Sequence, residues 1–182
     1  MFSFTNKKGF TLVELMVVIS IIGLLTAIIL PSFNAARKTS RVGQRVSNMK
    51  QVQAALEFYY SANHAYPSTG GQWFGTCSAF GGYAANAVVP GLVPTYIAAI
   101  PTDPQFSLND PNHNCYIYRS DGIDWAFVDF NVTELFVTQS LPNMNSYPEL
   151  IDPARDGGSN NSIVDGSYPT SWKVSSPGAI SW

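Results

Sequence analysis

Charged side chains are scarce in this chain of 182 residues, where Asp, Glu, Lys and Arg together make up 12% of the sequence. Soluble proteins usually carry about twice that share. The formal net charge is -2, so the chain lacks the excess of Lys and Arg with which DNA-binding proteins neutralise phosphates. Duplex nucleic acid is therefore not a predicted partner. Because hydrophobic residues reach 46%, we expect one modest domain with apolar surface left over for contacts with other molecules.

Motifs for catalysis are missing as well. The two histidines, His64 and His113, lie in no nucleophile or zinc signature, and GxSxG, HExxH and phosphate-loop patterns are absent. We therefore predict that the protein is not an enzyme and holds no metal or other cofactor. Calcium stays open as an alternative because hard cations take oxygen ligands. The eligible carboxylates form two groups, Asp121, Asp124 and Asp129, and Asp152, Asp156 and Asp165.

Cysteine is also rare. Cys77 and Cys115 are the only two, and no CxxC pair or neighbouring metal-type histidine accompanies them. A structural disulfide between them fits best if the domain is exported to an oxidising compartment. The alternative is a pair of free buried thiols.

The charged residues that the chain does contain are distributed unevenly. Seven of its ten Lys and Arg residues fall in the first fifty positions, where Glu14 is the only acid. The other eleven acids all come later. This asymmetry indicates that the two regions meet different surroundings.

A long apolar run follows the first basic residues. Residues 10–30 span 21 positions in which Glu14 is the only charge, and a helix of that length just crosses a hydrocarbon core of about 30 Å. Lys7 and Lys8 precede the run, which keeps the N-terminus in the cytoplasm and sends everything after Leu30 across the membrane. No Ala-x-Ala cleavage pattern follows the run, which disfavours an ordinary secretory signal.

The helical pattern continues beyond the apolar run. Apolar residues recur at steps of three and four, which predicts one helix over residues 10–62, bent at Pro31 and loosened near Gly23. The predicted core stripe comprises Val42, Val46, Met49, Val52, Leu56 and either Tyr59 or Tyr60. We expect the polar residues between them to lie on the other faces, namely Arg41, Gln44, Arg45, Ser47, Asn48, Lys50 and Gln51.

The rest of the chain predicts a small antiparallel sheet. Cys115–Arg119 and Ile123–Val128 are rich in strand formers and are joined by Ser120-Asp121-Gly122, which is typical of a hairpin. Residues 70–91 look like a loop, and 92–100 like a short helix or turn. A third strand is predicted at Glu134–Gln139 and a final edge strand near Trp172–Val174. The predicted class is α+β, with the long helix packed on the sheet.

The segment KKGFTLVELMVVISIIGLLTAIILPS, residues 7–32, resembles the N-terminus of type IV pilins and of the pseudopilins of type II secretion. The resemblance implies a leader over residues 1–9, cleaved between Gly9 and Phe10, and N-methylation of the new terminus at Phe10. It makes Glu14 the residue that guides assembly, and Gly23 and Pro31 the helix-loosening pair.

The same resemblance implies a function in polymerisation. The expected product is a structural subunit of a type IV pilus filament, with residues 63–182 as an extracytoplasmic domain. Its expected partners are further copies of itself, prepilin peptidase, the inner-membrane assembly platform, minor pilins and, before assembly, the lipid bilayer. The expected location is the bacterial inner membrane as a single-pass protein, followed by an extracellular pilus or a periplasmic pseudopilus.

Three further questions stay open. Glu14 either pairs with the amino group of Phe10 on a neighbouring subunit or only reaches the lipid headgroups. The segment LVPTYIAAIPTDP, residues 92–104, resembles a major pseudopilin body, whereas the cysteine pair and the loop-rich end over residues 141–182 favour a pilin. The third question is whether the chain is instead a membrane-anchored enzyme or ligand-binding protein.

Overall fold

The computed structural model describes residues 9–108, 110, 112–132, 147–150, 152 and 171–182. The chain forms two compact units, Met1–Ser40 and Arg41–Trp182. Helix α1 runs from Leu12 to Asn63 over 52 residues and contributes to both units. The predicted long helix is thus confirmed.

In the first unit, α1 exposes nearly all of its side chains. Its best 18-residue window has a mean hydropathy of 2.7, and none of that window is buried. Within the described residues, α1 is the one helix that is long and apolar enough to cross a membrane. The helix continues without a break through Gly23 and Pro31. The loosening expected at these two positions stays a prediction.

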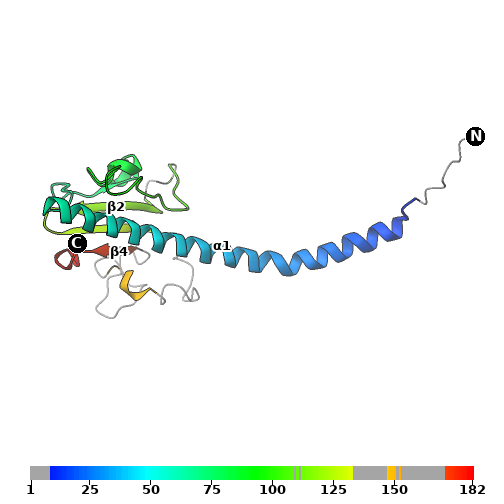
Figure 1. Ribbon diagram of the computed structural model, residues 1–182. Helices are drawn as coiled ribbons and strands as arrows, with labels where there is room; N and C mark the ends of the chain where they lie inside the picture. Colours follow the sequence, from blue (N-terminus) through cyan, green and yellow to red (C-terminus); the bar gives the residue numbers. More distant parts are fainter. Residues whose placement is uncertain (1–8, 109, 111, 133–146, 151, 153–170) are drawn as a thin grey trace, which may run out of the picture. The chain divides into compact units, whose positions relative to one another are not determined.

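In the second unit, the C-terminal part of α1 packs on a four-stranded antiparallel sheet with the order β1-β2-β3-β4. The strands are β1 (Phe74–Gly75), β2 (Cys115–Ser120), β3 (Trp125–Phe130) and β4 (Trp172–Ser175). Figure 1 shows this C-terminal part of α1 running along the sheet. The predicted α+β class is confirmed.

The core between α1 and the sheet follows from side-chain alternation. Successive strand residues point to opposite faces, so Tyr116 and Tyr118 of β2 and Phe127 of β3 meet the helix. The predicted helical stripe is buried against them, and its last member is Tyr59, because Tyr60 is exposed. Each large apolar side chain buried in this way stabilises the domain by about 1.5–3 kcal/mol relative to an exposed one.

Two expectations about the helix are wrong. The sequence predicts Arg45 and Asn48 on the polar faces, but both are buried. Each lies three or four residues from members of the apolar stripe, so the helix turns both side chains toward the sheet. Their polar groups must therefore find partners inside the domain.

The opposite face of the sheet carries a second cluster around the disulfide. Cys77 and Cys115 are bonded, with an S–S distance of 2.04 Å, and pack with Ile117, Val128 and Phe130. The predicted disulfide is confirmed. Its ends are 38 residues apart, and closing a loop of that length typically stabilises a domain by about 2–4 kcal/mol. The bond ties the loop that contains β1 to the start of β2.

The sheet departs from its predicted outline in two places. The Asp121 carboxylate accepts backbone N–H groups from Ile123 at 2.9 Å and Asp124 at 2.8 Å. This turn keeps Ile123 out of the ladder, so β3 begins at Trp125. The two-residue strand β1 falls in a segment that the sequence predicts to be a loop. Residues 92–100 contain turns, which is one of the two predicted alternatives. The edge strand β4 is confirmed, whereas the strand predicted at Glu134–Gln139 lies outside the described residues.

Candidate functional site

Helix α1 begins with a capping box. The Thr11 hydroxyl accepts the backbone N–H of Glu14 at 3.2 Å, and the Glu14 carboxylate accepts both the backbone N–H of Thr11 at 2.8 Å and its hydroxyl at 2.7 Å. Such reciprocal bonds satisfy N–H groups that the first turn of a helix leaves unpaired. Glu14 therefore has a local role within its own chain, which the resemblance did not reveal but the pattern Thr-x-x-Glu could have.

The residues just before the helix are accessible. The Phe10 side chain is 79% exposed, and a Cβ atom added at Gly9 would meet nothing within 4 Å. The fold of the chain therefore does not itself require glycine at position 9. A need for glycine there would have to come from a partner that approaches the backbone closely.

The first unit presents a continuous apolar surface. Apolar patches larger than a few hundred Å² are rare on soluble monomers and indicate contact with a membrane or with other proteins. The exposed large side chains of this unit are Phe10, Leu12, Val13, Leu15, Met16, Val17, Val18, Ile19, Ile21, Ile22, Leu24, Leu25, Leu30 and Phe33.

A cluster of buried charges joins α1 to the sheet in the second unit. The Arg45 guanidinium binds the Asp103 carboxylate through Nε at 2.5 Å and Nη2 at 3.2 Å, and Nη2 also donates to Gln105 at 3.2 Å. Arg45 Nε lies 3.5 Å from Oδ2 of Asp129 on β3. All three charged side chains are fully buried.

The cluster holds two acids and one base away from water. Burial raises the pKa of Asp129 well above its usual range, the negative charge of Asp103 raises it further, and Arg45 only partly opposes this. Beside it, burial raises the pKa of Tyr116, whose hydroxyl accepts a hydrogen bond from Asn48 at 3.1 Å. Helix, loop and sheet thus meet at one set of polar contacts.

The candidate calcium ligands that the structure describes do not converge. Asp121 caps its own turn, Asp124 accepts the Ser176 hydroxyl at 2.7 Å, and Asp129 belongs to the buried cluster. Asp152 pairs with Lys173 at 2.8 Å. In the part of the chain that the structure describes, no three His, Cys, Asp or Glu residues are grouped so as to hold a metal ion. Asp156 and Asp165 lie outside the described residues.

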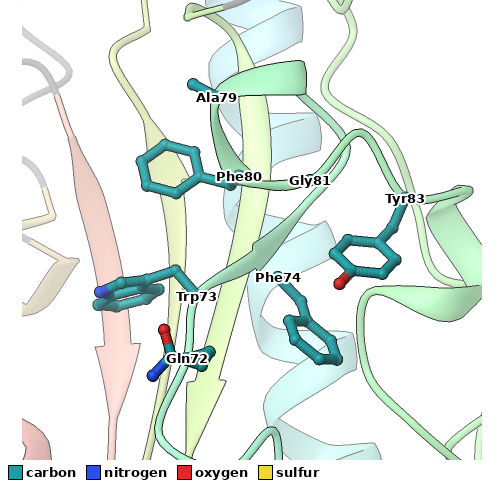
Figure 2. Close-up of a pocket in the computed structure, with 7 residues that line it drawn as sticks. All are labelled: Gln72, Trp73, Phe74, Ala79, Phe80, Gly81 and Tyr83. Carbon is teal, nitrogen blue, oxygen red and sulfur yellow. The ribbon is translucent and has the colours of Figure 1, made fainter.

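A shallow hollow of about 440 Å³ lies beside the disulfide loop. Figure 2 shows Trp73, Phe80, Phe74 and Tyr83 around it, and the rings of Phe74 and Tyr83 stack with centroids 4.5 Å apart. None of its lining residues is an acid, a base or a thiol.

Comparison with known proteins matches the start of the chain and part of its body. The family model described as the prokaryotic N-terminal methylation motif matches residues 4–30. The type II secretion system core protein G of Escherichia coli (strain K12) is 32% identical over 125 residues, which cover 65% of this chain and 83% of that protein. This chain belongs to the type IV pilin and type II secretion pseudopilin family.

Other members of this family match this chain over a shorter stretch. The type IV major pilin protein PilA of Myxococcus xanthus is 37% identical over 61 residues, or 34% of this chain and 28% of that protein. The type IV wide pilus major component PilA4 of Thermus thermophilus is 38% identical over 63 residues, or 35% and 48%. No solved structure matches the chain. The family is one of structural filament subunits, as the resemblance implied.

Proposed function

We propose that this chain is a structural subunit of a type IV pilus, processed by prepilin peptidase and polymerised through its apolar N-terminal helix. The observation that carries the proposal is the first unit itself. It combines the methylation motif with an apolar helix surface that the chain leaves uncovered. Lipid covers that surface before assembly, and neighbouring helices cover it in the filament.

The proposal divides the chain into three functional parts. Residues 1–9 form a cytoplasmic leader, removed by cleavage between Gly9 and Phe10, and the peptidase then methylates Phe10. Residues 10–62 form the helical part of the chain, and the span over residues 10–30 anchors the precursor in the inner membrane as a single pass. Residues 63–182 form the globular domain outside the cytoplasm, where the disulfide is consistent with an oxidising compartment.

In this proposal Glu14 sets the position of each incoming subunit. A carboxylate within a bilayer costs a few kcal/mol and needs a partner. The amino group created at Phe10 by cleavage supplies a positive charge close to the same depth on a neighbouring subunit. Because Phe10 is exposed, its terminus is accessible to such a neighbour. Gly23 and Pro31 would let the helix extend between subunits.

A pseudopilin of a type II secretion system is the second candidate. The match to core protein G extends over 125 residues and so reaches beyond the helix, whereas the matches to PilA and PilA4 span 61 and 63 residues. Two features favour a pilin, namely the disulfide and the long chain beyond β3. Both candidates share the same route of processing and polymerisation.

Shearing of cells that express the gene at its native level separates the two candidates. We expect surface filaments whose main band is this chain, seen by electron microscopy and identified by mass spectrometry. If the mature chain stays with the cell envelope and its deletion blocks export of a folded protein, the pseudopilin is correct. If the chain is neither in filaments nor needed for export, the proposed function fails.

A further inference from the structure

The strongest feature that the proposed function does not use is the buried cluster of Arg45, Asp103 and Asp129. Its members come from three separate elements of the second unit, which are α1, the loop after residue 101 and β3. Each side chain is fully buried. An arginine could be paired by one carboxylate alone, so the second acid requires an explanation.

The hydrogen bonds treat the two acids differently. Asp103 takes both Nε and Nη2 of Arg45 and also accepts the backbone N–H of Gln105 at 2.7 Å. Asp129 stands 3.5 Å from Arg45 Nε. Neither of its carboxyl oxygens, which are both buried, accepts a hydrogen bond from a donor within the part of the chain that the structure describes. Asp103 is thus the hydrogen-bonded partner of Arg45, and Asp129 has no base of its own among the described residues but shares Arg45 at 3.5 Å.

The charge balance decides the state of Asp129. With Arg45 paired to Asp103, an ionised Asp129 would place one net negative charge in an interior that excludes water, which is strongly disfavoured. The ionisable groups that face it are Arg45 from α1, Asp103 from the loop and Tyr116 from β2. Lys173 of β4 binds Asp152 and the backbone carbonyl of Ile180 instead.

We propose that Arg45, Asp103 and Asp129 form a proton-dependent latch, in which a proton on Asp129 lets the helix sit closely on the sheet and its loss at alkaline pH loosens that contact. The latch concerns the folded domain alone and does not depend on whether the chain forms a pilus or a pseudopilus. The latch binds a proton, and protonation determines how closely α1 packs on the sheet.

The direction of the pH effect follows from proton binding in the two states. Asp129 has a raised pKa in the folded domain, so the unfolded chain releases this proton at a lower pH than the folded chain. The contribution of Asp129 is complete below the ordinary pKa of an aspartate and is lost as the pH rises toward its folded value. Within that window the ratio of folded to unfolded chain falls by about tenfold for each unit of pH.

The test is thermal unfolding of the full chain in detergent micelles from about pH 5 to pH 9, followed by the near-ultraviolet circular dichroism of the buried tryptophans. We expect the wild-type midpoint to fall across this range. Asp129→Asn keeps the shape without the titration, so its midpoint should fall less and should equal or exceed that of the wild type at the alkaline end. An Asp129→Asn curve that parallels the wild-type curve overturns the proposal.

The matched control is Asp121→Asn on the same hairpin. Backbone hydrogen bonds from Asp124 and Ile123 lower the pKa of Asp121, so its stabilising effect is lost as the pH falls, and its removal should leave the alkaline decline unchanged. A direct readout does not need a variant that folds. The carboxyl carbon signal of Asp129 in the wild-type chain should be that of a protonated acid at neutral pH, and the signal of an ionised carboxylate there would refute the latch.

Discussion

Replacing Glu14 with alanine is expected to leave the precursor inserted and cleaved but to abolish filaments. Removal of the carboxylate eases insertion because a charge in lipid is disfavoured by a few kcal/mol. The same change deletes the contact that aligns an incoming subunit with its neighbour, and attraction between opposite charges is strong where water is excluded. Processing should therefore stay intact while assembly is lost.

The capping box makes a sharper experiment possible, because Glu14 both caps α1 and carries the charge. Glu14→Gln keeps a side chain that can close the box with Thr11 but removes the charge. Thr11→Ala removes the hydroxyl of the box but keeps the carboxylate. The proposed pairing with Phe10 predicts that Glu14→Gln fails to assemble and that Thr11→Ala assembles.

Leader cleavage is measured by the electrophoretic mobility of the chain from the membrane fraction. Assembly is measured by the amount of chain in sheared filaments. Glu57→Ala is a suitable control because Glu57 is an exposed acid of the same helix in the second unit. The reverse outcome, with filaments from Glu14→Gln and none from Thr11→Ala, would show that Glu14 acts as a helix cap. Normal filaments from both variants and from Glu14→Ala would leave the residue without a role in assembly.

Replacing Arg45 with alanine is expected to lower the free energy of unfolding of the domain by about 3–5 kcal/mol. The substitution leaves the Asp103 carboxylate buried without its cation, beside a second buried acid. It also removes the hydrogen bond to Gln105 and the packing of a long side chain. A loss of this size is a large share of the stability of a single domain.

Urea unfolding of the full chain in detergent, followed by tryptophan fluorescence, measures this loss. The matched control is Lys50→Ala, because Lys50 and Glu149 form an ion pair at 4.0 Å with side chains that are 57% and 55% exposed. Such exposed pairs contribute about 0–1 kcal/mol. The double variant Arg45→Met with Asp103→Leu should lose less than Arg45→Ala, since it leaves no unpaired charge. A loss below about 1 kcal/mol for Arg45→Ala would contradict the exclusion of water from this buried cluster.

The sequence predicts the helical half of the core well because its periodicity is direct evidence of a buried face. Val42, Met49 and Val52 lie where the three- and four-residue steps place them. Arg45 and Asn48 occupy equivalent steps, but charged and amide side chains are usually exposed. Their residue types therefore hid their position. The signal that could have found Arg45 is its spacing of three from Val42 and four from Met49.

The sheet was harder to outline for local reasons. A strand of two residues, such as β1, shows no alternation that a pattern could detect. Asp121-Gly122 predicts the hairpin. However, the side chain of Asp121 caps the turn, so β3 begins only at Trp125. Asp129 lies in a run of strand formers, and only the fold brings it to Arg45. A cluster built from three elements leaves no pattern along the chain.

The most direct test of the account is the intact mass of the mature chain purified from the filament or membrane fraction. We predict a chain that lacks residues 1–9 and begins at Phe10 with one added methyl group. Gly9→Val is the companion variant, because a Cβ at position 9 meets nothing in the chain itself and any block must arise at the peptidase. That variant should accumulate as uncleaved precursor. A wild-type chain that keeps its leader, or that is cut after Leu30, would contradict the account.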